Sequence, residues 1–407
     1  MPIGLNLPSN ILPIEGIELG CISAEIYRKK KRNDLSIIKL AEGTGVAAVF
    51  TTNQFVAAPV EVAKQHLKEK SARYLLINAG NANAGTGARG FKDAKISCES
   101  VAKLTGCEIE EVLPFSTGVI GEYLPLVNIQ NVLPDLLSDL SKDNWMKVAE
   151  AIMTTDTISK AYSKQVEING KIATVTGICK GSGMIRPNMA TMLAYVATDA
   201  AVDGIFLQDI LQQAVNKSFN RITVDGDMST NDACILMATG KANNSLIKNC
   251  ESDDYDAFYA AILDVFSHLA QTIIRDGEGA SKFVTVKVEN GYSQQDCLKI
   301  AYQIAHSPLV KTALNASDAN WGRILAAVGS AKAEYLDINK VNIFLNDVCI
   351  ISNGERAANY SEEQGQAVMQ LTEITITIDL QKGNESETVW TTDLSHDYIS
   401  INADYRT

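Results

Sequence analysis

The stretch from Lys180 to Leu193 contains the residues whose types and spacing best suit chemistry. It reads Lys-Gly-Ser-Gly-Met-Ile-Arg-Pro-Asn-Met-Ala-Thr-Met-Leu, so two glycines and a proline turn the chain before a small residue and a hydroxyl, Ala190 and Thr191. If the Thr191 hydroxyl attacks the Ala190 carbonyl, an N-to-O acyl shift gives an ester that water can cleave. Thr191 then becomes a new N-terminus, and its free α-amino group can act as a base toward its own hydroxyl.

This pattern is compatible with self-cleavage between Ala190 and Thr191 and with a threonine nucleophile. The competing interpretation is that Thr191 is a structural residue that opens a buried strand. A Ser-His-Asp enzyme is disfavoured, because each of the four histidines is isolated from any glycine-flanked serine or cysteine: His66, His268, His306 and His396.

Two other motifs resemble ligand sites without completing them. Asp225-Gly226-Asp227 and Asn231-Asp232 suggest a cation site, but no glutamate follows at calcium-loop spacing. We therefore expect no metal, and interpret these residues as turn and helix-start residues near the active site. Gly85–Gly90 formally matches the G-x-G-x-x-G fingerprint. Several residues separate it from the preceding strand and no clear second strand ending in an acid follows, so no dinucleotide cofactor is expected.

The first half of the chain shows the pattern of an α/β architecture. Short β-like runs at Val46–Thr51 and Tyr74–Ile77 are followed by an expected loop at Asn78–Gly90 and a helix near Phe91–Leu104. Thr191–Ala197 is an apolar run of strand length, which would place Thr191 at the first position of a buried strand.

In the second half, apolar residues at helical spacing predict a helix over Tyr255–Arg275, with Gly277 as its stop. A strand over Phe283–Val288 follows, which places Glu278 in the short loop between them. From about residue 290 the pattern indicates a smaller α+β unit, with these elements: a helix at Cys297–Ala305 and strands at Val341–Leu345 and Ile374–Leu380.

Composition bounds the class of protein. A chain of 407 residues that is 46% hydrophobic can bury a large core and form two or more domains. The net charge of −12 argues against nucleic acid as a partner, and the basic cluster Arg28–Arg32 is interpreted as a solvated turn. Eight scattered cysteines without a C-x-x-C pair are expected to be reduced thiols. Met1–Pro13 lacks the features of a secretory signal and no stretch predicts a membrane span, so a cytoplasmic protein is expected.

The chain resembles the ornithine acetyltransferase family, the glutamate/ornithine N-acetyltransferases of arginine biosynthesis. The Lys180–Leu193 segment is similar to the cleavage motif of that family. Further similarity runs through most of the chain, in this order: Asn53–Val60, Asn78–Gly87, Thr117–Gly121, Thr154–Thr157, Thr223–Asp232, Arg275–Lys282, Asp318–Gly329 and Asn402–Thr407. The sequence departs from the family at Tyr27–Asn33, which is more basic, and at Leu314–Ser317. Both differences could affect the range of substrates.

The resemblance implies roles for particular residues. Thr191 would be the nucleophile, acetylated in the first half-reaction, and Thr117 and Gly118 would form the oxyanion hole through a hydroxyl and a backbone N–H. The family's substrate-binding positions match a further set: Thr154, Lys180, Thr191, Glu278, Asn402 and Thr407. Thr155 is an alternative to Thr154. Each role has a plainer rival: Lys180 as a surface charge, Glu278 as an exposed residue at a helix end, Thr117 as a turn hydroxyl.

The resemblance also implies the reaction and the architecture. The acetyl group would move from N2-acetyl-L-ornithine to Thr191 and then to L-glutamate, without a cofactor. Some members also use acetyl coenzyme A as donor. The implied fold is a layered α-β sandwich at residues 1–289 and a smaller α+β domain at 290–407, whose tail reaches the active site. Cleavage would give alpha (1–190) and beta (191–407) chains, in a heterotetramer of two each.

Two rival functions remain from the residues alone. An acyl-threonine attacked by water would make an amidase or aminopeptidase, and an uncut chain would fit a non-catalytic amino-acid-binding protein.

Overall fold

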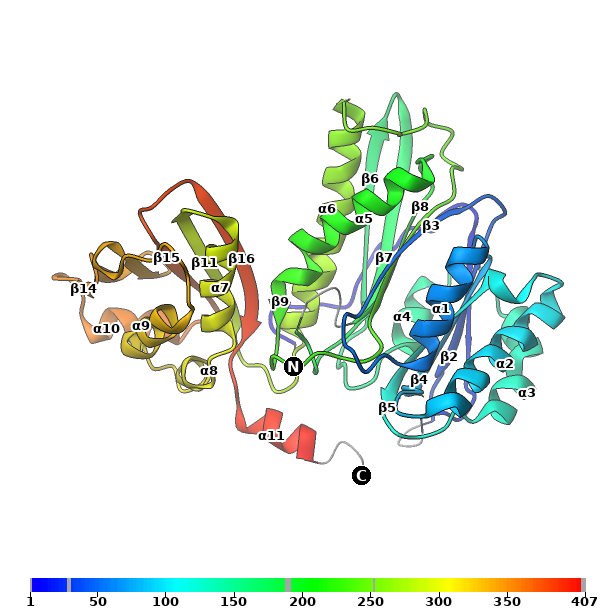
Figure 1. Cartoon of the computed structure of the whole chain (residues 1–407), viewed down its shortest axis with the longest axis horizontal. Coiled ribbons are helices and arrows are strands. Elements are labelled where there is room, and N and C mark those ends of the chain that lie inside the picture. The colour runs from blue at the N-terminus through cyan, green and yellow to red at the C-terminus, as the bar shows by residue number, and fades with distance from the viewer. Residues whose placement is uncertain (1, 28–30, 187–191, 252, 404–407) are drawn as a thin grey trace. The chain divides into compact units, whose positions relative to one another are not determined.

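The strands and helices of the chain form two compact units in the computed structural model (Figure 1). The structure describes residues 2–27, 31–186, 192–251 and 253–403. The larger unit comprises Asn6–Asn220 and Asp227–Ile273, and the smaller unit comprises Met1–Leu5, Arg221–Gly226 and Ile274–Thr407. Both units combine sheets with helices, which confirms the mixed α/β class expected from the sequence.

One sheet of the larger unit has four strands in the order β1-β2-β4-β5. Their bounds are Ile17–Ile22, Leu35–Leu40, Tyr74–Asn81 and Val112–Val119. Only β4 and β5 are parallel. Helices α2 (Gly87–Thr105) and α3 (Leu126–Ser138) pack on one face of this sheet, where Leu76, Cys98 and Leu133 share an apolar core (Figure 1). Helix α1 (Ala58–Glu69) contacts β5 and α2.

The second sheet of the larger unit has five strands in the order β3-β10-β8-β7-β6. Their bounds are Gly45–Phe50, Ala233–Ala238, Leu193–Thr198, Lys171–Lys180 and Lys160–Ile168. Strands β10 and β8 are parallel, whereas the other neighbours are antiparallel. Leu193 of β8 pairs with Lys180 of β7 on one side and with Ala233 of β10 on the other.

The two sheets of the larger unit enclose a common core. Ile77 and Phe115 of the first sheet share this core with Ile178 and Tyr195 of the second. Helix α4 (Trp145–Ala151) contacts strands of both sheets and buries Trp145 in the same core. Helices α5 (Gly204–Lys217) and α6 (Asp253–Arg275) lie against the five-stranded sheet (Figure 1). This is the layered α-β sandwich that the resemblance implies.

Helix α6 has the length and the apolar composition of a membrane span, yet it is a core helix. Of its most apolar window, 56% is buried inside the protein. Phe258, Val265 and Leu269 are fully buried, and a side chain at Gly177 of β7 would collide with Leu269 and Val265. The apolar face of α6 therefore packs on the sheet.

The smaller unit is built on a seven-stranded sheet in the order β14-β13-β12-β15-β11-β16-β9. The bounds are Glu355–Arg356, Val348–Ser352, Asn342–Leu345, Glu373–Asp379, Phe283–Gly291, Glu385–Thr392 and Ile222–Thr223. Its helices are α7 (Gln294–Ala305), α8 (Pro308–Asn315), α9 (Trp321–Ser330), α10 (Glu362–Met369) and α11 (His396–Ala403). Strands β11 and β15 share a core with α7 and α9.

Three details differ from the sequence-based expectations. The boundary expected near residue 290 falls within β11, which pairs with both β15 and β16 and so belongs wholly to the smaller unit. The expected loop Asn78–Gly90 is shorter, because β4 continues to Asn81 beside β5 and α2 begins at Gly87. The helix start expected at Asn231-Asp232 is wrong, since strand β10 follows and pairs on both sides.

Candidate active site

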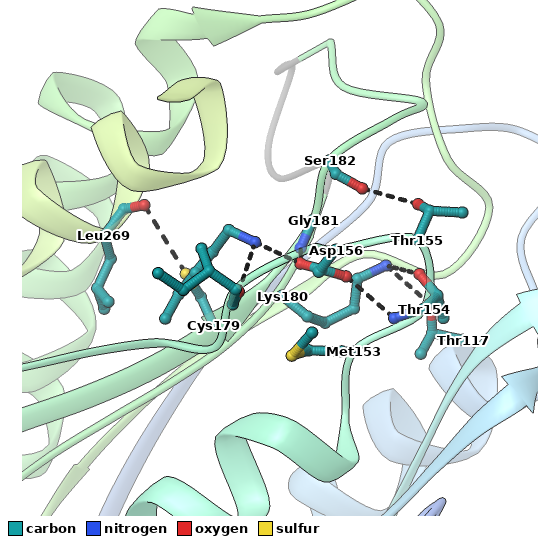
Figure 2. Close-up of polar contacts among 12 residues, drawn as sticks. Thr117, Met153, Thr154, Thr155, Asp156, Cys179, Lys180, Gly181, Ser182 and Leu269 are labelled. Atoms are coloured by element: carbon teal, nitrogen blue, oxygen red, sulfur yellow. Dashed lines mark hydrogen bonds and ion pairs between the residues drawn. The ribbon is translucent and has the colours of Figure 1, made fainter. Parts of the chain in front are cut away.

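Lys180 joins two of the other residues that the resemblance implicates. Its ammonium Nζ donates a hydrogen bond to Thr117 Oγ1 over 3.1 Å and another to Thr154 Oγ1 over 3.3 Å (Figure 2). Lys180 ends β7, Thr117 lies in β5 of the other sheet, and Thr154 follows α4. The plainer interpretations of Lys180 as a surface charge and of Thr117 as a turn hydroxyl are therefore wrong.

The strand register places this cluster at the beginning of β8. Lys180, the last residue of β7, pairs with Leu193, the first residue of β8. Leu193 stands two positions after Thr191 in the sequence. The expected nucleophile Thr191 and the expected cleavage partner Ala190 lie outside the described residues.

Asp156 holds the two segments that carry the cluster, and sequence reasoning missed it. Its carboxylate accepts the backbone N–H of Thr154 over 3.0 Å and that of Gly181 over 2.7 Å (Figure 2). It also forms a 2.6 Å ion pair with Lys160, and the side chains of both partners are fully buried. Burial alone would raise the pKa of the Asp156 carboxyl, but the charges of Lys160 and Lys180 and the hydrogen bonds it accepts hold it below its usual value.

The neighbouring threonines 154 and 155 have different partners. Thr154 Oγ1 accepts from Lys180, whereas Thr155 Oγ1 shares a 2.7 Å hydrogen bond with Ser182 Oγ (Figure 2). Of the two hydroxyls, that of Thr154 is the one bonded to the lysine. This geometry favours Thr154 over the alternative that the sequence left open.

Gly118 occupies a position that admits no side chain. Its φ is +132°, and a Cβ built there would lie 2.2 Å from the carbonyl carbon of Gly80. The two glycines pair between the parallel strands β5 and β4. Thr117 is only 8% exposed. The close approach of the two backbones fixes the peptide between Thr117 and Gly118. The expected role of these two residues in an oxyanion hole stays a prediction.

Asp232 has a buried carboxyl whose pKa is influenced by the charge of Lys180. It directly precedes β10 and is 3% exposed. Burial raises the pKa of the Asp232 carboxyl well above its usual value, although the charge of Lys180 and a hydrogen bond from Ser229 act in the opposite direction. Within the described residues, Asp232 Oδ2 has no hydrogen-bond partner. No group of side chains in the described part of the chain is arranged to hold a metal ion.

Glu278 and Asn402 form a second pair, within the smaller unit. Asn402 Nδ2 of α11 donates to Glu278 Oε2 over 2.8 Å. Glu278 lies in the turn after α6, as expected, but it is 8% exposed, so its interpretation as a solvent-exposed residue is wrong. Ser395 Oγ donates to the Gly279 carbonyl over 2.6 Å, which ties α11 to this turn. Thr407 lies outside the described residues.

The chain is similar to known proteins over nearly its whole length. The model of the ArgJ family matches residues 18–407. The arginine biosynthesis bifunctional protein ArgJ of Pseudomonas syringae pv. tomato is 55% identical over 407 residues, which is 100% of both chains.

Two solved structures are also similar in sequence. The arginine biosynthesis bifunctional protein ArgJ of Bacillus halodurans is 39% identical, with a TM-score of 0.49, over 51% of this chain and 96% of that chain. The ornithine acetyltransferase of Mycobacterium tuberculosis, complexed with ornithine, is 32% identical, with a TM-score of 0.38, over 44% of this chain and 94% of that chain.

Proposed function

The chain belongs to the ArgJ family and is an acetyltransferase of arginine biosynthesis, and we propose that the Thr191 hydroxyl carries the acetyl group from N2-acetyl-L-ornithine to L-glutamate. Self-cleavage between Ala190 and Thr191 precedes this reaction and frees the α-amino group of Thr191. The observation that supports the proposal most directly is the hydrogen bond from Lys180 to Thr117 at the start of β8.

That hydrogen bond leaves the Thr117 hydroxyl hydrogen available to donate to an oxyanion. A hydroxyl has one hydrogen to donate, and its oxygen can accept at the same time. Because the ammonium of Lys180 donates to Thr117 Oγ1, the oxygen is occupied as an acceptor and the hydroxyl hydrogen is free to point elsewhere. A positive charge on the acceptor side also makes that hydrogen a better donor. Thr117 is thereby suited to stabilise the negative oxygen of a tetrahedral intermediate, together with the N–H of Gly118.

The first half-reaction breaks the amide of the donor. The Thr191 hydroxyl oxygen attacks the acetyl carbon, and the hydroxyl proton moves to the α-amino group of the same residue. When the tetrahedral intermediate collapses, the C–N bond breaks and that proton passes to the departing nitrogen. Ornithine leaves, and the acetyl group remains on Thr191 as an ester.

The second half-reaction reverses these steps with another amine. The amino group of glutamate attacks the ester carbonyl, the C–O bond breaks, and N-acetylglutamate leaves while Thr191 regains its proton. The ammonium of Lys180 suits the carboxylate of an amino-acid substrate, and the carboxylate of Glu278 suits an ammonium group. Thr154, Asn402 and Thr407 complete the substrate-binding set.

The enzyme acts in the cytoplasm as two alpha and two beta chains, and takes no cofactor.

The test combines the mass of the chain with its turnover. We expect the purified protein to give two fragments that divide at Ala190/Thr191. It should release ornithine from acetylornithine repeatedly only when glutamate is present, and no more than about one equivalent per active site without it. Thr191→Ala should abolish cleavage and transfer together, whereas Thr191→Ser should retain some of each because a hydroxyl remains. Repeated ornithine release without glutamate, beyond one equivalent per active site, would favour an amidase. Full transfer by the Thr191→Ala variant would refute the proposed nucleophile.

A further inference from the structure

The side chain of Asp393 holds the stretch of chain that follows Glu278. Asp393 directly follows β16 and is buried. Its Oδ1 accepts the backbone N–H of Ser281 over 2.8 Å and that of Lys282 over 3.0 Å, and its Oδ2 accepts the hydroxyl of Ser281 over 2.6 Å. These two residues lie between Glu278 and the start of β11 at Phe283. One carboxylate thus fixes the backbone where the turn that carries Glu278 leads into the sheet.

Asn315 adds a further donor to the same carboxylate. It is the last residue of α8, and its Nδ2 donates to Asp393 Oδ2 over 2.7 Å. Asn315 lies within Leu314–Ser317, where the sequence departs from the family that it resembles. The backbone N–H of Leu394 also donates to the Lys311 carbonyl of α8 over 3.1 Å. Helix α8 therefore holds the segment around Asp393, and a residue of the departing stretch takes part.

Lys311 brings a buried positive charge to this segment. Its ammonium donates to Thr391 Oγ1 over 3.0 Å and to the Thr392 carbonyl. Burial lowers the pKa of Lys311 to about 8, while the charges of Asp393 and Asp225 act in the opposite direction. A buried ammonium is costly without a counter-charge, and these two carboxylates supply one.

The second of these carboxylates contacts α11, the helix that carries Asn402. The hydroxyl of Tyr398 donates to Asp225 Oδ2 over 3.3 Å. Asn402 lies one helical turn further along, where its Nδ2 donates both to the Tyr398 carbonyl over 3.0 Å and to Glu278 Oε2 over 2.8 Å. The place of Asn402 relative to Glu278 is therefore set by contacts on both sides of the pair.

We propose that Asp393 is a positioning residue, which Asn315 and Lys311 hold in place and which aligns the Glu278 carboxylate with Asn402 for substrate; the inference rests on the proposed role of that pair in substrate binding. A binding group must be held within about 0.5 Å of its productive position by the residues around it. A displaced Glu278 binds the ammonium group of the substrate less well, while the chemistry at Thr191 is retained. The expected signature is a higher KM with little change in kcat.

Asp393→Asn tests this role directly. The amide keeps the shape of the side chain but loses the charge and two of the acceptor sites of the carboxylate. We expect the KM for acetylornithine to rise about ten-fold and kcat to stay within about three-fold. Asp296→Asn is the matched control, because Asp296 is also buried in the smaller unit and accepts the backbone N–H groups of Glu334 and Tyr335. A purely structural loss lowers the amount of active enzyme and leaves KM unchanged, so the control should keep its KM within about two-fold.

Asn315→Ala is a milder variant that decides the matter if Asp393→Asn fails to fold. Alanine favours a helix, so α8 should be retained. The KM for acetylornithine should rise about three-fold, because Asp393 loses one of its donors. Thr312→Ala is its control, since Thr312 is exposed on the same helix and its hydroxyl bonds the Pro308 carbonyl.

A double-mutant cycle shows whether Asp393 acts through Glu278. If the only consequence of Asp393→Asn is a displaced carboxylate, the variant should have no further effect once that carboxylate is removed. In the Glu278→Ala background, we therefore expect Asp393→Asn to change kcat/KM for acetylornithine by less than about two-fold. Where Asp393→Asn fails to fold, Asn315→Ala takes its place in the cycle.

Three outcomes would overturn the assignment: an unchanged KM in the folded variants at Asp393 and Asn315, an equal rise of KM in Asp296→Asn, or a full effect in the Glu278→Ala background. Each of them leaves transfer from acetylornithine to glutamate by the wild type intact. Loss of that transfer in the wild type would instead contradict the proposed function.

Discussion

The backbone N–H of Gly181 donates a 2.7 Å hydrogen bond to Asp156 Oδ1. The same oxygen pairs with Lys160, while Oδ2 accepts the N–H of Thr154. A single carboxylate thus joins the end of β7, which carries Lys180, to the loop that carries Thr154. Because the charge is buried, its position is set by these partners and not by solvent.

Asp156→Asn should destabilise the protein by about 3–5 kcal/mol, because the buried ammonium of Lys160 loses its counter-charge. Asp156→Asn/Lys160→Met removes both charges and should recover much of that loss. Urea unfolding of the two variants and the wild type measures the difference. A single variant as stable as the wild type would show that the pair contributes nothing, and a double variant no better than the single one would point to the lost hydrogen bonds.

Thr117→Val should reduce kcat by about 10²–10³, since removal of one oxyanion donor costs about 2.7–4 kcal/mol of transition-state stabilisation. Valine keeps the shape of threonine and its preference for a strand, so β5 should fold normally. Thr155→Val is the matched control, because its hydroxyl pairs with Ser182 and not with Lys180. The measurement is glutamate-dependent release of ornithine at saturating substrate. Similar kcat values for the two variants would remove Thr117 from the oxyanion hole.

The raised pKa of Asp232 predicts how the stability of the protein depends on pH. Its pKa is raised in the folded protein, so its contribution to stability is complete below the unfolded value of about 3.9 and is lost as the pH rises toward the folded value. Asp232→Asn is neutral at every pH and avoids this loss.

The melting temperature of Asp232→Asn relative to the wild type should therefore increase as the pH is raised from about 4 to about 7. The effect can reach at most about 1.4 kcal/mol per pH unit. Asp143→Asn is the control at an exposed carboxyl and should show no such trend. If the difference for Asp232→Asn does not change with pH, the carboxyl is ionised in the folded protein.

The elements that carry the site were predictable because their signals are local. The apolar spacing over α6 and the apolar run of β8 gave both elements within a few residues. The end of β4 was missed, because Asn78–Asn81 has a loop-like composition and becomes a strand only by pairing with β5. The helix expected at Asn231-Asp232 failed for the same reason, since pairing with β3 and β8 overrides a helix-start signal.

Some residues of the candidate site were predictable from the sequence, and others were not. Thr117, Thr154 and Lys180 came from a resemblance, and the structure brings their side chains together. Asp156 stands within the matched run Thr154–Thr157, but nothing in its local sequence shows that Lys160 and the N–H of Gly181 surround it. The burial and charge pairing of Asp156 depend on segments that meet only in the folded protein. Its role in holding the site together can therefore be identified only from the structure.

The last prediction concerns the C-terminal segment. Chain ends are normally dispensable, but Asn402 hydrogen-bonds the buried Glu278, and α11 is tied to the same turn through Ser395. Gly279 has a φ of +67°, and a Cβ there would lie 2.4 Å from the backbone nitrogen of Tyr398. The helix therefore packs closely on the turn that presents Glu278.

Deletion of Asn402–Thr407 should leave self-cleavage intact, because that chemistry needs the Ala190/Thr191 junction and its supports. Transfer should fall sharply, with weaker substrate binding and more hydrolysis of the acetyl-threonine. Asn402→Ala tests the hydrogen bond alone and should lower kcat/KM about ten- to hundred-fold, as expected for a bond of about 1.5–3 kcal/mol to a charged group. Ser400→Ala on the same helix is the control, since its hydroxyl bonds only the His396 carbonyl among the contacts described. The measurements are a denaturing gel for the two fragments and ornithine release with and without glutamate. Unchanged transfer kinetics in the truncated enzyme would show that the segment has no part in substrate binding.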